Sequence, residues 1–382
     1  MSERKLATIQ KIKTISPIKD ADRIEVCTIN GWQIVSQKGI HSVGDLVIYA
    51  EIDSFIPAED IRFASFSERF TEWNGIRGMR VKTIKLKKCI SQGIILPLKE
   101  FPEIKNAKEG DDVTDILKIV KWESAEEKSG NNGNSDAGGK FPSFLVKTDQ
   151  ERAQNILDVL ETKLDHKFEA TIKKDGSSMT VFCVKPNSDY YNSAKGLYKK
   201  EVKNTVWNRV KSLFKKKEQD KPVFGICSRN ILLKQEGESN FHKAETYYNL
   251  FGTLNSLAGQ GSFAIQGELV APNIQGNFEK VSNVEFHVFS VFDINNQRYL
   301  TPVDRYNLLG NSVRHVSPVG TDTLRNLIGY IDGDSLIERL LAYAEGPSDN
   351  KAVKREGIVF KSSTEDFSFK TVANSSLLQK DK

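Results

Sequence analysis

A break in composition near residue 130 constrains the fold more than any other feature of the chain. Residues 125–140, AEEKSGNNGNSDAGGK, are rich in Gly, Asn and Ser and offer almost no side chain to a hydrophobic core. Such a stretch is typical of a flexible linker, which we place at residues 121–142. The full chain has 382 residues, enough for two or three packed domains. We therefore expect one domain at residues 1–120 and another at residues 143–382.

The first domain is expected to be all-β. Short runs of β-branched and aromatic residues recur here, separated by Gly and by turn-forming residues. This spacing predicts a small barrel or sandwich. The runs are DRIEVCTI, WQIVSQ, DLVIYAEI, MRVKTIKL and GIILPL.

The second domain is expected to be α+β. Thr148 and Glu151 form a capping-box pattern at the start of TDQERAQNILDVLETKL, which predicts an amphipathic helix. Further strand and helix patterns then alternate without the strict period of βαβ units. A Lys-rich insertion, which we place at residues 185–222, interrupts this domain. Its segment 198–221 fits either a solvated surface helix or an RNA-contacting element in which Lys215, Lys216 and Lys217 meet phosphates.

A strand that carries two adjacent lysines offers a candidate for chemistry. In EATIKKDGSSMTVF, residues 169–182, period-two alternation places Lys173 on the polar face of the strand and Lys174 on the apolar side. The Asp-Gly pair at 175–176 predicts a hairpin turn, with residues 179–184 as the returning strand. Lys173 would then lie at a strand end, where it could be directed into a pocket.

Composition and motifs exclude several classes of protein. The four cysteines are scattered without a CxxC pair, and no apolar run follows the charged MSERK start, so we expect a reducing intracellular setting, cytoplasmic or nuclear. No stretch is apolar enough for a membrane span. The net charge of +5 is only mildly basic, so any affinity for nucleic acid must come from local patches. The histidines lack HExxH spacing, which favours oxygen ligands and Mg²⁺ or Mn²⁺ over zinc.

Six short motifs follow one another along the second domain. Each is weak alone: Glu268 would suit a surface carboxylate, Phe289 a core aromatic and Lys361 a surface lysine. Together and in this order they resemble the covalent nucleotidyltransferases, and the preceding β domain makes the chain most similar to ATP-dependent RNA ligases of the Naegleria type, which carry an N-terminal OB domain. The motifs are K-x-D-G, S-R, G-E, F-x-x-F-D-I, E-G-I-V-F-K and S-F-K.

This resemblance implies both a fold and an activity. The fold would be an α+β nucleotidyltransferase (adenylyltransferase) domain preceded by an all-β OB-fold barrel. The activity would be ATP-dependent joining of RNA 3′-OH and 5′-phosphate ends through lysyl-AMP and RNA-adenylate intermediates, on a nicked duplex and as a monomer. The alternatives are a DNA ligase, an mRNA capping guanylyltransferase, or a non-catalytic RNA-binding protein with a decayed site.

The resemblance also assigns roles to residues. Lys173 would be the nucleophile, Lys370 would contact the α-phosphate, and Glu356 would hold Mg²⁺ or Mn²⁺ through water. Two departures from the pattern stand out, because Ser368 replaces the first lysine of a K-x-K motif and the insertion lengthens the interval between Lys173 and Arg229. The remaining residues expected to contact the nucleotide are Thr171, Ile172, Ser228, Arg229, Glu268, Phe289 and Lys361.

Overall fold

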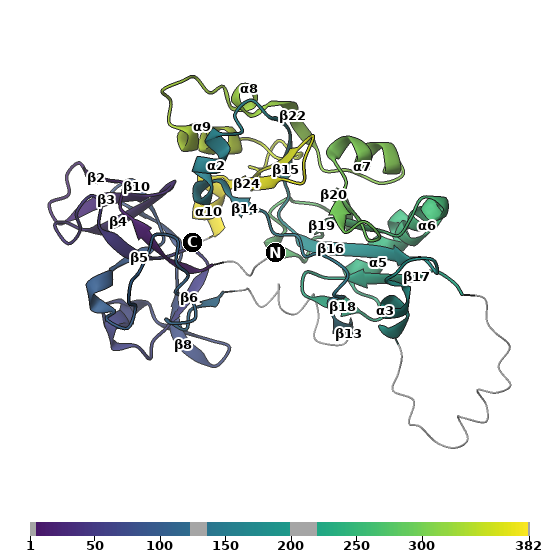
Figure 1. Ribbon diagram of the computed structural model, residues 1–382, viewed down its shortest axis with the longest axis horizontal. Coiled ribbons are helices and arrows are strands. Elements are labelled where there is room, and N and C mark those ends of the chain that lie inside the picture. Colours follow the sequence, from purple (N-terminus) through teal and green to yellow (C-terminus); the bar gives the residue numbers. More distant parts are fainter. Residues whose placement is uncertain (1–4, 123–135, 199–219, 381–382) are drawn as a thin grey trace, which may run out of the picture.

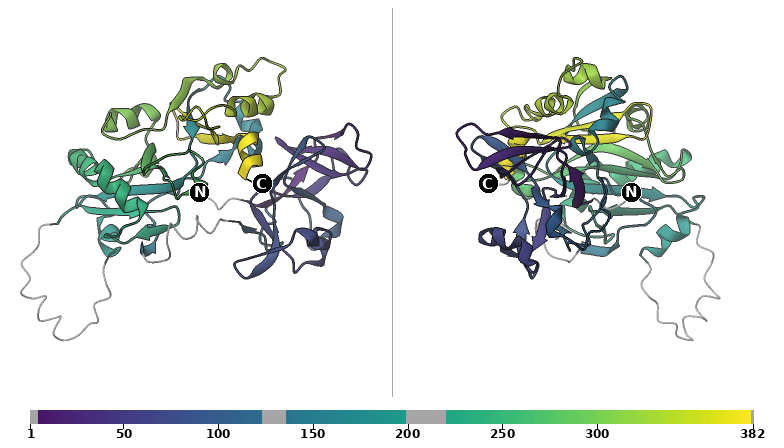
Figure 2. Two further views of the ribbon diagram at one scale, coloured as in Figure 1. Left: turned by 180° about the vertical axis from the view of Figure 1, so that it is seen from behind. Right: turned by 60° about the vertical axis from the view of Figure 1, so that its left-hand side comes forward.

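The structure is a computed structural model that describes residues 5–122, 136–198 and 220–380. An all-β body built from the N-terminal residues lies beside a larger body of sheets and helices (Figure 1). The C-terminal helix α10 (Asn374–Lys380) lies where the two bodies meet, in both views of the junction (Figures 1 and 2). Within the described residues, no helix is long and apolar enough to cross a membrane.

The N-terminal body consists of small antiparallel sheets, as the sequence predicts. The sheet orders are β1-β5-β11, β2-β3-β4, β9-β10 and β12-β6-β8-β7. The strands are β1 (Ala7–Lys11), β2 (Thr14–Pro17), β3 (Ile24–Ile29), β4 (Trp32–Gln37), β5 (Leu46–Ala50), β6 (Ser54–Pro57), β7 (Thr71–Trp73), β8 (Ile76–Arg80), β9 (Thr83–Leu86), β10 (Cys89–Gln92), β11 (Ile94–Pro97) and β12 (Val120–Lys121), with short helices η1 (Ile61–Arg69) and η2 (Leu98–Glu100).

Strand β5 organises the core of this body. It pairs with β1 on one side and β11 on the other, and its residues are almost wholly buried. The Tyr49 ring lies 6.2 Å from the Trp32 ring, and its hydroxyl donates to the Gln92 carbonyl at 3.0 Å. Gly93 has φ +110°, and a Cβ there would lie 2.3 Å from the Tyr49 ring. Glycine at this position therefore lets the chain turn directly over the buried aromatic core.

The larger body contains a seven-stranded and a five-stranded sheet, ordered β13-β18-β17-β16-β19-β20-β21 and β14-β24-β23-β15-β22. Its strands are β13 (Ala137–Lys140), β14 (Glu151–Arg152), β15 (Lys167–Lys173), β16 (Ser177–Val184), β17 (Val223–Cys227), β18 (Ile231–Leu233), β19 (Phe263–Val270), β20 (Glu285–Asp293), β21 (Arg298–Tyr299), β22 (Pro318–Thr323), β23 (Gly357–Ser362) and β24 (Ser368–Val372). Its helices are η4 (Ala153–Asn155), α2 (Leu157–Glu161), α3 (Tyr191–Gly196), α5 (Asn240–Tyr248), α6 (Leu250–Ser256), η5 (Leu257–Gly259), η6 (Gln275–Asn277), α7 (Pro302–Leu309), α8 (Leu324–Ile328), α9 (Leu336–Ala344) and α10.

The predicted strand around Lys173 is confirmed, but the predicted hairpin is wrong. Strand β15 pairs with β22 and β23, whereas β16 pairs with β17 and β19 in the other sheet. Neither Asp175 nor Gly176 has the positive φ that a tight Asp-Gly hairpin turn requires. A Cβ at Gly176 would lie 2.3 Å from the Leu269 carbonyl oxygen. Glycine at this position therefore lets the chain pass close to the backbone of β19 as it runs from one sheet to the other.

The helix predicted from Thr148 is also wrong in its first half. Residues Glu151–Arg152 form an edge strand parallel to β24, and the helix begins only at Leu157. The capping box does not form, since the Thr148 hydroxyl contacts the Ser178 hydroxyl at 3.2 Å instead. Pairing with β24 outweighs the local helical preference, and residues 148–150 line the pocket outside regular secondary structure.

The interval expected as a linker is ordered at both ends. Strand β12 (Val120–Lys121) pairs with β6 of the N-terminal body, and β13 (Ala137–Lys140) pairs with β18 of the larger body. Residues 123–135 lie outside the described part of the chain. The two ends of the interval 121–142 therefore belong to sheets, and its Gly-rich end forms an edge strand.

Polar and apolar contacts join the two bodies. The Trp32 indole N–H donates to the Asn155 side chain at 2.6 Å, and the Asn155 amide donates to Glu51 at 2.9 Å. Val372 and Leu377 of the larger body pack into the hydrophobic core of the N-terminal body. The two bodies therefore share buried surface, which fixes one wall of the pocket described next.

Candidate active site

A pocket of about 510 Å³ lies between the two sheets of the larger body and is closed on one side by the N-terminal body. Every nucleotide-, metal- or catalysis-related residue predicted from the motifs contributes to its lining. These residues are Thr171, Ile172, Lys173, Ser228, Arg229, Glu268, Phe289, Glu356, Lys361 and Lys370. The remaining predicted group, the RNA-contacting residues Lys215, Lys216 and Lys217, lies outside the described residues.

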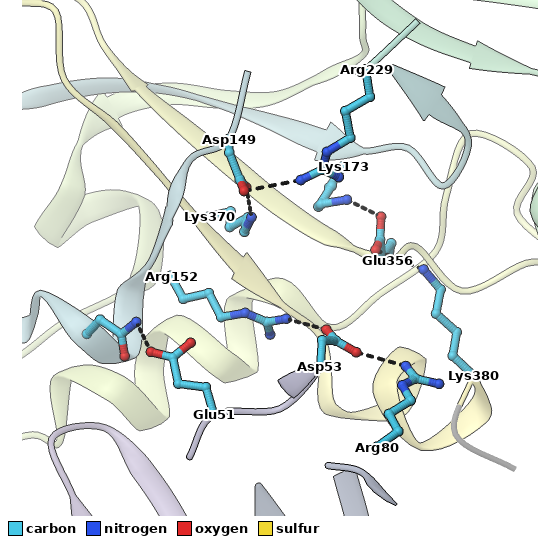
Figure 3. A network of polar contacts seen from close by, with 11 residues as sticks. Glu51, Asp53, Arg80, Asp149, Arg152, Lys173, Arg229, Glu356, Lys370 and Lys380 are labelled. Atoms are coloured by element: carbon cyan, nitrogen blue, oxygen red, sulfur yellow. Dashed lines mark hydrogen bonds and ion pairs between the residues drawn. The ribbon is translucent and has the colours of Figure 1, made fainter. Parts of the chain in front are cut away.

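Lys173 projects from the end of β15 into this pocket and contacts the Glu356 carboxylate (Figure 3). Glu356 immediately precedes β23, the neighbour of β15, and Lys173 pairs in register with Gly357. Burial raises the pKa of Glu356, but Lys173 and Lys380 more than offset this effect and hold it below its usual value. The antiparallel pairing thus places an amine and an ionised carboxylate side by side.

Asp149 joins two cations at the other side of the pocket (Figure 3). Its carboxylate accepts from Lys370 at 2.7 Å and from Arg229 at 3.2 Å. Burial raises the pKa of Asp149, yet these two cations hold it well below its usual range. Burial also lowers the pKa of Lys370 to about 8, against the opposing effect of Asp149. A phosphate group could bind these same two cations, since both are good phosphate ligands.

Asp149 had no role in the sequence-based prediction. The capping-box pattern predicts Asp149 in the first turn of a helix, whereas it lies outside regular secondary structure just before β14. In the sequence, Asp149 is marked only by its position in the segment before the strand that carries Lys173. This position does not distinguish it from the neighbouring polar residues.

The backbone of Phe289 is held from behind the pocket. Its carbonyl accepts from Lys361 at 2.5 Å and from Arg305 at 2.7 Å. Arg305 is fully buried and donates two bonds, each 3.0 Å, to the Glu169 carboxylate. Burial, reinforced by Arg305, lowers the pKa of Lys361 to about 7. The polar face of β15 therefore supports the strand that carries Phe289.

Three carboxylates surround Lys173 and could bind a divalent cation. Burial and the neighbouring Glu356 raise the pKa of Asp175 to about 6, and burial raises that of Glu268 to about 7 despite the nearby Lys173. The Oδ2 atom of Asp175 is buried and has no hydrogen-bond partner among the described residues. Oxygen donors are what Mg²⁺ and Mn²⁺ prefer. In the described ranges no group of three or more His, Cys, Asp or Glu side chains is arranged as direct metal ligands.

Lys174 faces away from Lys173 in a separate buried network. Its ammonium lies 3.0 Å from Glu279 and 2.7 Å from Asp349. The Ser348 hydroxyl donates to Glu279 at 2.7 Å. These two adjacent lysines therefore have different surroundings, and of the two Lys173 is the one that contacts Glu356.

The N-terminal body supplies a charged wall of the pocket. Arg80 lies 2.8 Å from Asp53, and its guanidinium lies 3.7 Å from the centroid of the Trp122 ring. Arg152 of the larger body reaches the same Asp53 at 3.5 Å (Figure 3). Lys121 also lines this wall. These cations are in addition to those that the motifs predicted.

The Lys-rich insertion joins the described chain away from Arg229. Val184 at the end of β16 pairs with Val223 at the start of β17, and Thr180 pairs with Cys227. Arg229 follows the other end of β17, and the strand from Val223 to Cys227 alone spans roughly 13 Å. Closeness in sequence to Arg229 therefore does not by itself bring this insertion to the pocket.

Comparisons with known proteins agree with this architecture. The RNA ligase family model matches residues 166–372, and an OB-fold domain model matches residues 6–98. No curated protein matches the chain.

Solved structures of Naegleria gruberi RNA ligase are similar to this chain over its length. A variant with ATP and Mn is 35% identical with a TM-score of 0.81, and the match covers 99% of this chain and 100% of that one. A second variant, with AMP and Mn, is 35% identical with a TM-score of 0.82 at the same coverage. A structure with PPi is 36% identical with a TM-score of 0.80, covering 98% of each chain.

These matches confirm the α+β nucleotidyltransferase domain and the preceding OB-fold domain that the sequence predicts. The resemblance inferred from six ordered motifs is likewise confirmed. The chain belongs to the RNA ligase family.

Proposed function

We propose that this RNA ligase uses ATP to join an RNA 3′-OH end to an RNA 5′-phosphate end. The observation that carries the proposal is the convergence of Lys173, Glu356, Arg229 and Lys370 on one pocket. Naegleria gruberi RNA ligase, solved with ATP and Mn and with AMP and Mn, supports ATP and a divalent cation as the requirements of the present enzyme.

In the first step, the Lys173 amine attacks the α-phosphorus of ATP. An N–P bond forms, the bond to the β-phosphate oxygen breaks, and pyrophosphate leaves. The amine must lose a proton before or during attack, and the Glu356 carboxylate is the group in contact with it. Lys370 and Arg229 would exchange Asp149 for the phosphate and neutralise charge on it.

The next two steps use the same cations. An oxygen of the RNA 5′-phosphate attacks the phosphorus of lysyl-AMP and releases the Lys173 amine, which gives an RNA-adenylate. The RNA 3′-OH then attacks the 5′-phosphate, forms the phosphodiester and expels AMP. All three transfers need positioning and charge neutralisation, and Lys370 and Arg229 provide both.

A divalent cation, Mg²⁺ or Mn²⁺, would be held by Glu356 with the help of Asp175 and Glu268. When bound it neutralises negative charge that develops on the transferring phosphate. The unpartnered Oδ2 of Asp175 and the burial of all three carboxylates support this location.

The nucleoside would lie against the strands that carry Phe289 and Thr171. Phe289 would stack on adenine, with Lys361 and Arg305 holding its backbone from behind. Glu268 and Arg229 would contact the ribose. Thr171, Ile172 and Ser228 line the same part of the pocket and would complete the nucleotide contacts.

The preferred substrate is proposed to be a nicked duplex, and the active unit a monomer. One chain supplies both walls of the pocket, including Arg80 and Lys121 from the N-terminal side, which supports a monomer. All four cysteines are free thiols, which supports a reducing compartment, cytoplasmic or nuclear.

Incubation with labelled ATP and labelled GTP, followed by sealing assays, tests the proposal. We expect covalent label from ATP alone, and sealing of nicked RNA in preference to nicked DNA and to single strands. Label from GTP would instead indicate a capping guanylyltransferase, and preferential sealing of nicked DNA a DNA ligase. RNA binding without any covalent label would indicate a non-catalytic protein.

A further inference from the structure

Lys380, near the end of helix α10, reaches into the group of carboxylates around Lys173. Its ammonium lies 2.8 Å from Asp175 Oδ1 and 2.9 Å from Glu356 Oε1. The side chain is 27% exposed, whereas those of Asp175 and Glu356 are 10% and 12% exposed. One lysine from a distant part of the chain therefore bridges two buried carboxylates (Figure 3 shows its approach to Glu356).

Helix α10 is anchored independently of these carboxylates. Leu377 packs into the core of the OB-fold domain, and the Ser375 N–H and hydroxyl donate to Glu345 at 3.0 and 2.5 Å. Gln92 of the OB-fold domain donates to Asn374 at 3.3 Å. Because the helix is fixed by these contacts, Lys380 is delivered to the carboxylates by the fold and is not a loosely placed surface side chain.

The two carboxylates need a cation. One ammonium lies within 2.9 Å of an oxygen of each carboxylate, so the two negative charges lie close together and repel each other. Lys173 contacts Glu356, but its amine is the group that must react with ATP. Among the described residues, the second ammonium that contacts Glu356 is that of Lys380. Unlike Lys173, Lys380 also contacts Asp175. A second oxygen of Asp175 remains without a described partner.

We propose that Lys380 is a built-in counter-ion that holds Asp175 and Glu356 together before metal binds, and that a divalent cation displaces its ammonium. This inference rests on the proposed function of Glu356 in metal binding. Lys380 acts through the two carboxylates, so it is a positioning residue. Its charge holds them side by side in the metal-free enzyme, and the same charge competes with the metal for their oxygens.

The test is Mn²⁺ binding to the full chain without ATP, measured by calorimetry and by the electron paramagnetic resonance signal of free Mn²⁺. Lys380→Met keeps the length of the side chain and removes its charge. We expect Mn²⁺ to bind at least about tenfold more tightly, because a unit charge near two partly buried carboxylates no longer opposes it. Lys351→Met, at an exposed lysine of the same domain, should leave the affinity unchanged.

A purely structural role for Lys380 predicts the opposite result. If the lysine only stabilises the fold, Lys380→Met will bind Mn²⁺ with equal or lower affinity, and that result would overturn the proposal. A thermal melt of each variant shows whether the protein is folded at the temperature of the titration.

Chemical labelling of the wild-type chain provides a measurement that needs no substitution at Lys380. Reductive methylation followed by mass spectrometry should show severalfold more labelling of Lys380 with saturating Mn²⁺ than without, with Lys351 constant. Labelling of Lys380 that does not change with Mn²⁺ would also refute displacement.

Glu356→Gln separates this proposal from the function on which it rests. If Glu356→Gln weakens Mn²⁺ binding and Lys380→Met does not tighten it, the counter-ion role fails and the metal assignment stands. If Glu356→Gln leaves Mn²⁺ binding unchanged, the metal assignment itself fails.

Discussion

Lys173 and Lys174 are neighbours in sequence, yet their ammonium groups contact different carboxylates. Lys173 contacts Glu356 in the pocket, whereas Lys174 is buried between Glu279 and Asp349, at 3.0 and 2.7 Å. Lys173 is positioned to react with a substrate in the pocket. Lys174 neutralises the negative charge of Glu279 and Asp349 inside the protein.

A matched pair of substitutions should separate these roles. Lys173→Met should abolish label transfer from ATP to protein and melt near the wild-type temperature, because Lys380 still neutralises Glu356. Lys174→Met should leave Glu279 without its cation and destabilise the fold by about 3–5 kcal/mol. Below its melting transition, Lys174→Met should keep label transfer per folded molecule. Gel autoradiography and thermal melts measure both, and equal loss of label in the two folded variants would contradict the assignment.

Glu356→Gln should weaken the metal-dependent steps of the reaction. The amide keeps the shape of the side chain but loses the negative charge that attracts a divalent cation. In phosphodiester formation from preformed adenylylated nicked RNA, we expect the Mn²⁺ concentration for half-maximal rate to rise about tenfold or more. Glu338→Gln, at an exposed carboxylate of α9, is the control. Superimposable titration curves for Glu356→Gln and wild type would exclude a metal role for Glu356.

The raised pKa of Glu268, about 7, makes stability depend on pH in a defined direction. The folded protein holds a proton that the unfolded chain, with an ordinary carboxyl pKa of 4.5, releases earlier. Its stabilising effect is complete below pH 4.5 and is lost as pH rises to 7. Glu268→Gln has no carboxyl group to titrate and does not lose this stability. Between pH 4.5 and pH 7 its free energy of unfolding should therefore rise by about 2 kcal/mol relative to that of the wild type. Denaturant unfolding across this range measures the difference, and parallel profiles would show that Glu268 titrates normally.

The sequence could predict the parts of the site that belong to local patterns. Alternation in β15 correctly placed Lys173 on the polar face with Glu169 and Thr171, and six ordered motifs identified pocket-lining residues. It could not predict Asp149, because the choice between strand and helix there depends on pairing with β24. The Asp-Gly pair after Lys174 suggested a hairpin, yet partners from other parts of the chain draw β15 and β16 into different sheets.

Lys380 illustrates the same limit at longer range. Nothing in its local sequence distinguishes it from a lysine that faces only solvent. It reaches Asp175 and Glu356 because Leu377 is buried in a domain that begins more than 300 residues earlier. Only tertiary packing brings these groups together.

The Lys-rich insertion remains a candidate for RNA contact. Each lysine that neutralises a phosphate releases counterions, so removing a contact changes the slope of log affinity against log salt by about 0.7 to 0.9. If Lys215, Lys216 and Lys217 contact RNA, changing them to Ala should flatten the slope, weaken binding about equally across sequences and leave label transfer from ATP intact. Filter binding at several salt concentrations measures the slope. An unaltered slope would show that these three lysines do not contact RNA.

The Arg305–Glu169 pair should be important for both stability and nucleotide binding. Arg305→Met leaves the Glu169 carboxylate buried without its two 3.0 Å bonds, which should cost about 3–5 kcal/mol of unfolding free energy. The double variant Glu169→Gln with Arg305→Met removes the unpaired charge and should recover more than about 1 kcal/mol of that loss.

Since Arg305 also holds the Phe289 carbonyl, both variants should show a raised KM for ATP in the label-transfer assay. Arg325→Met, at a partly exposed arginine whose partners Asp165 and Asp332 are both exposed, should melt close to wild type. A double variant that is no more stable than Arg305→Met would mean that the two buried groups do not act as a pair.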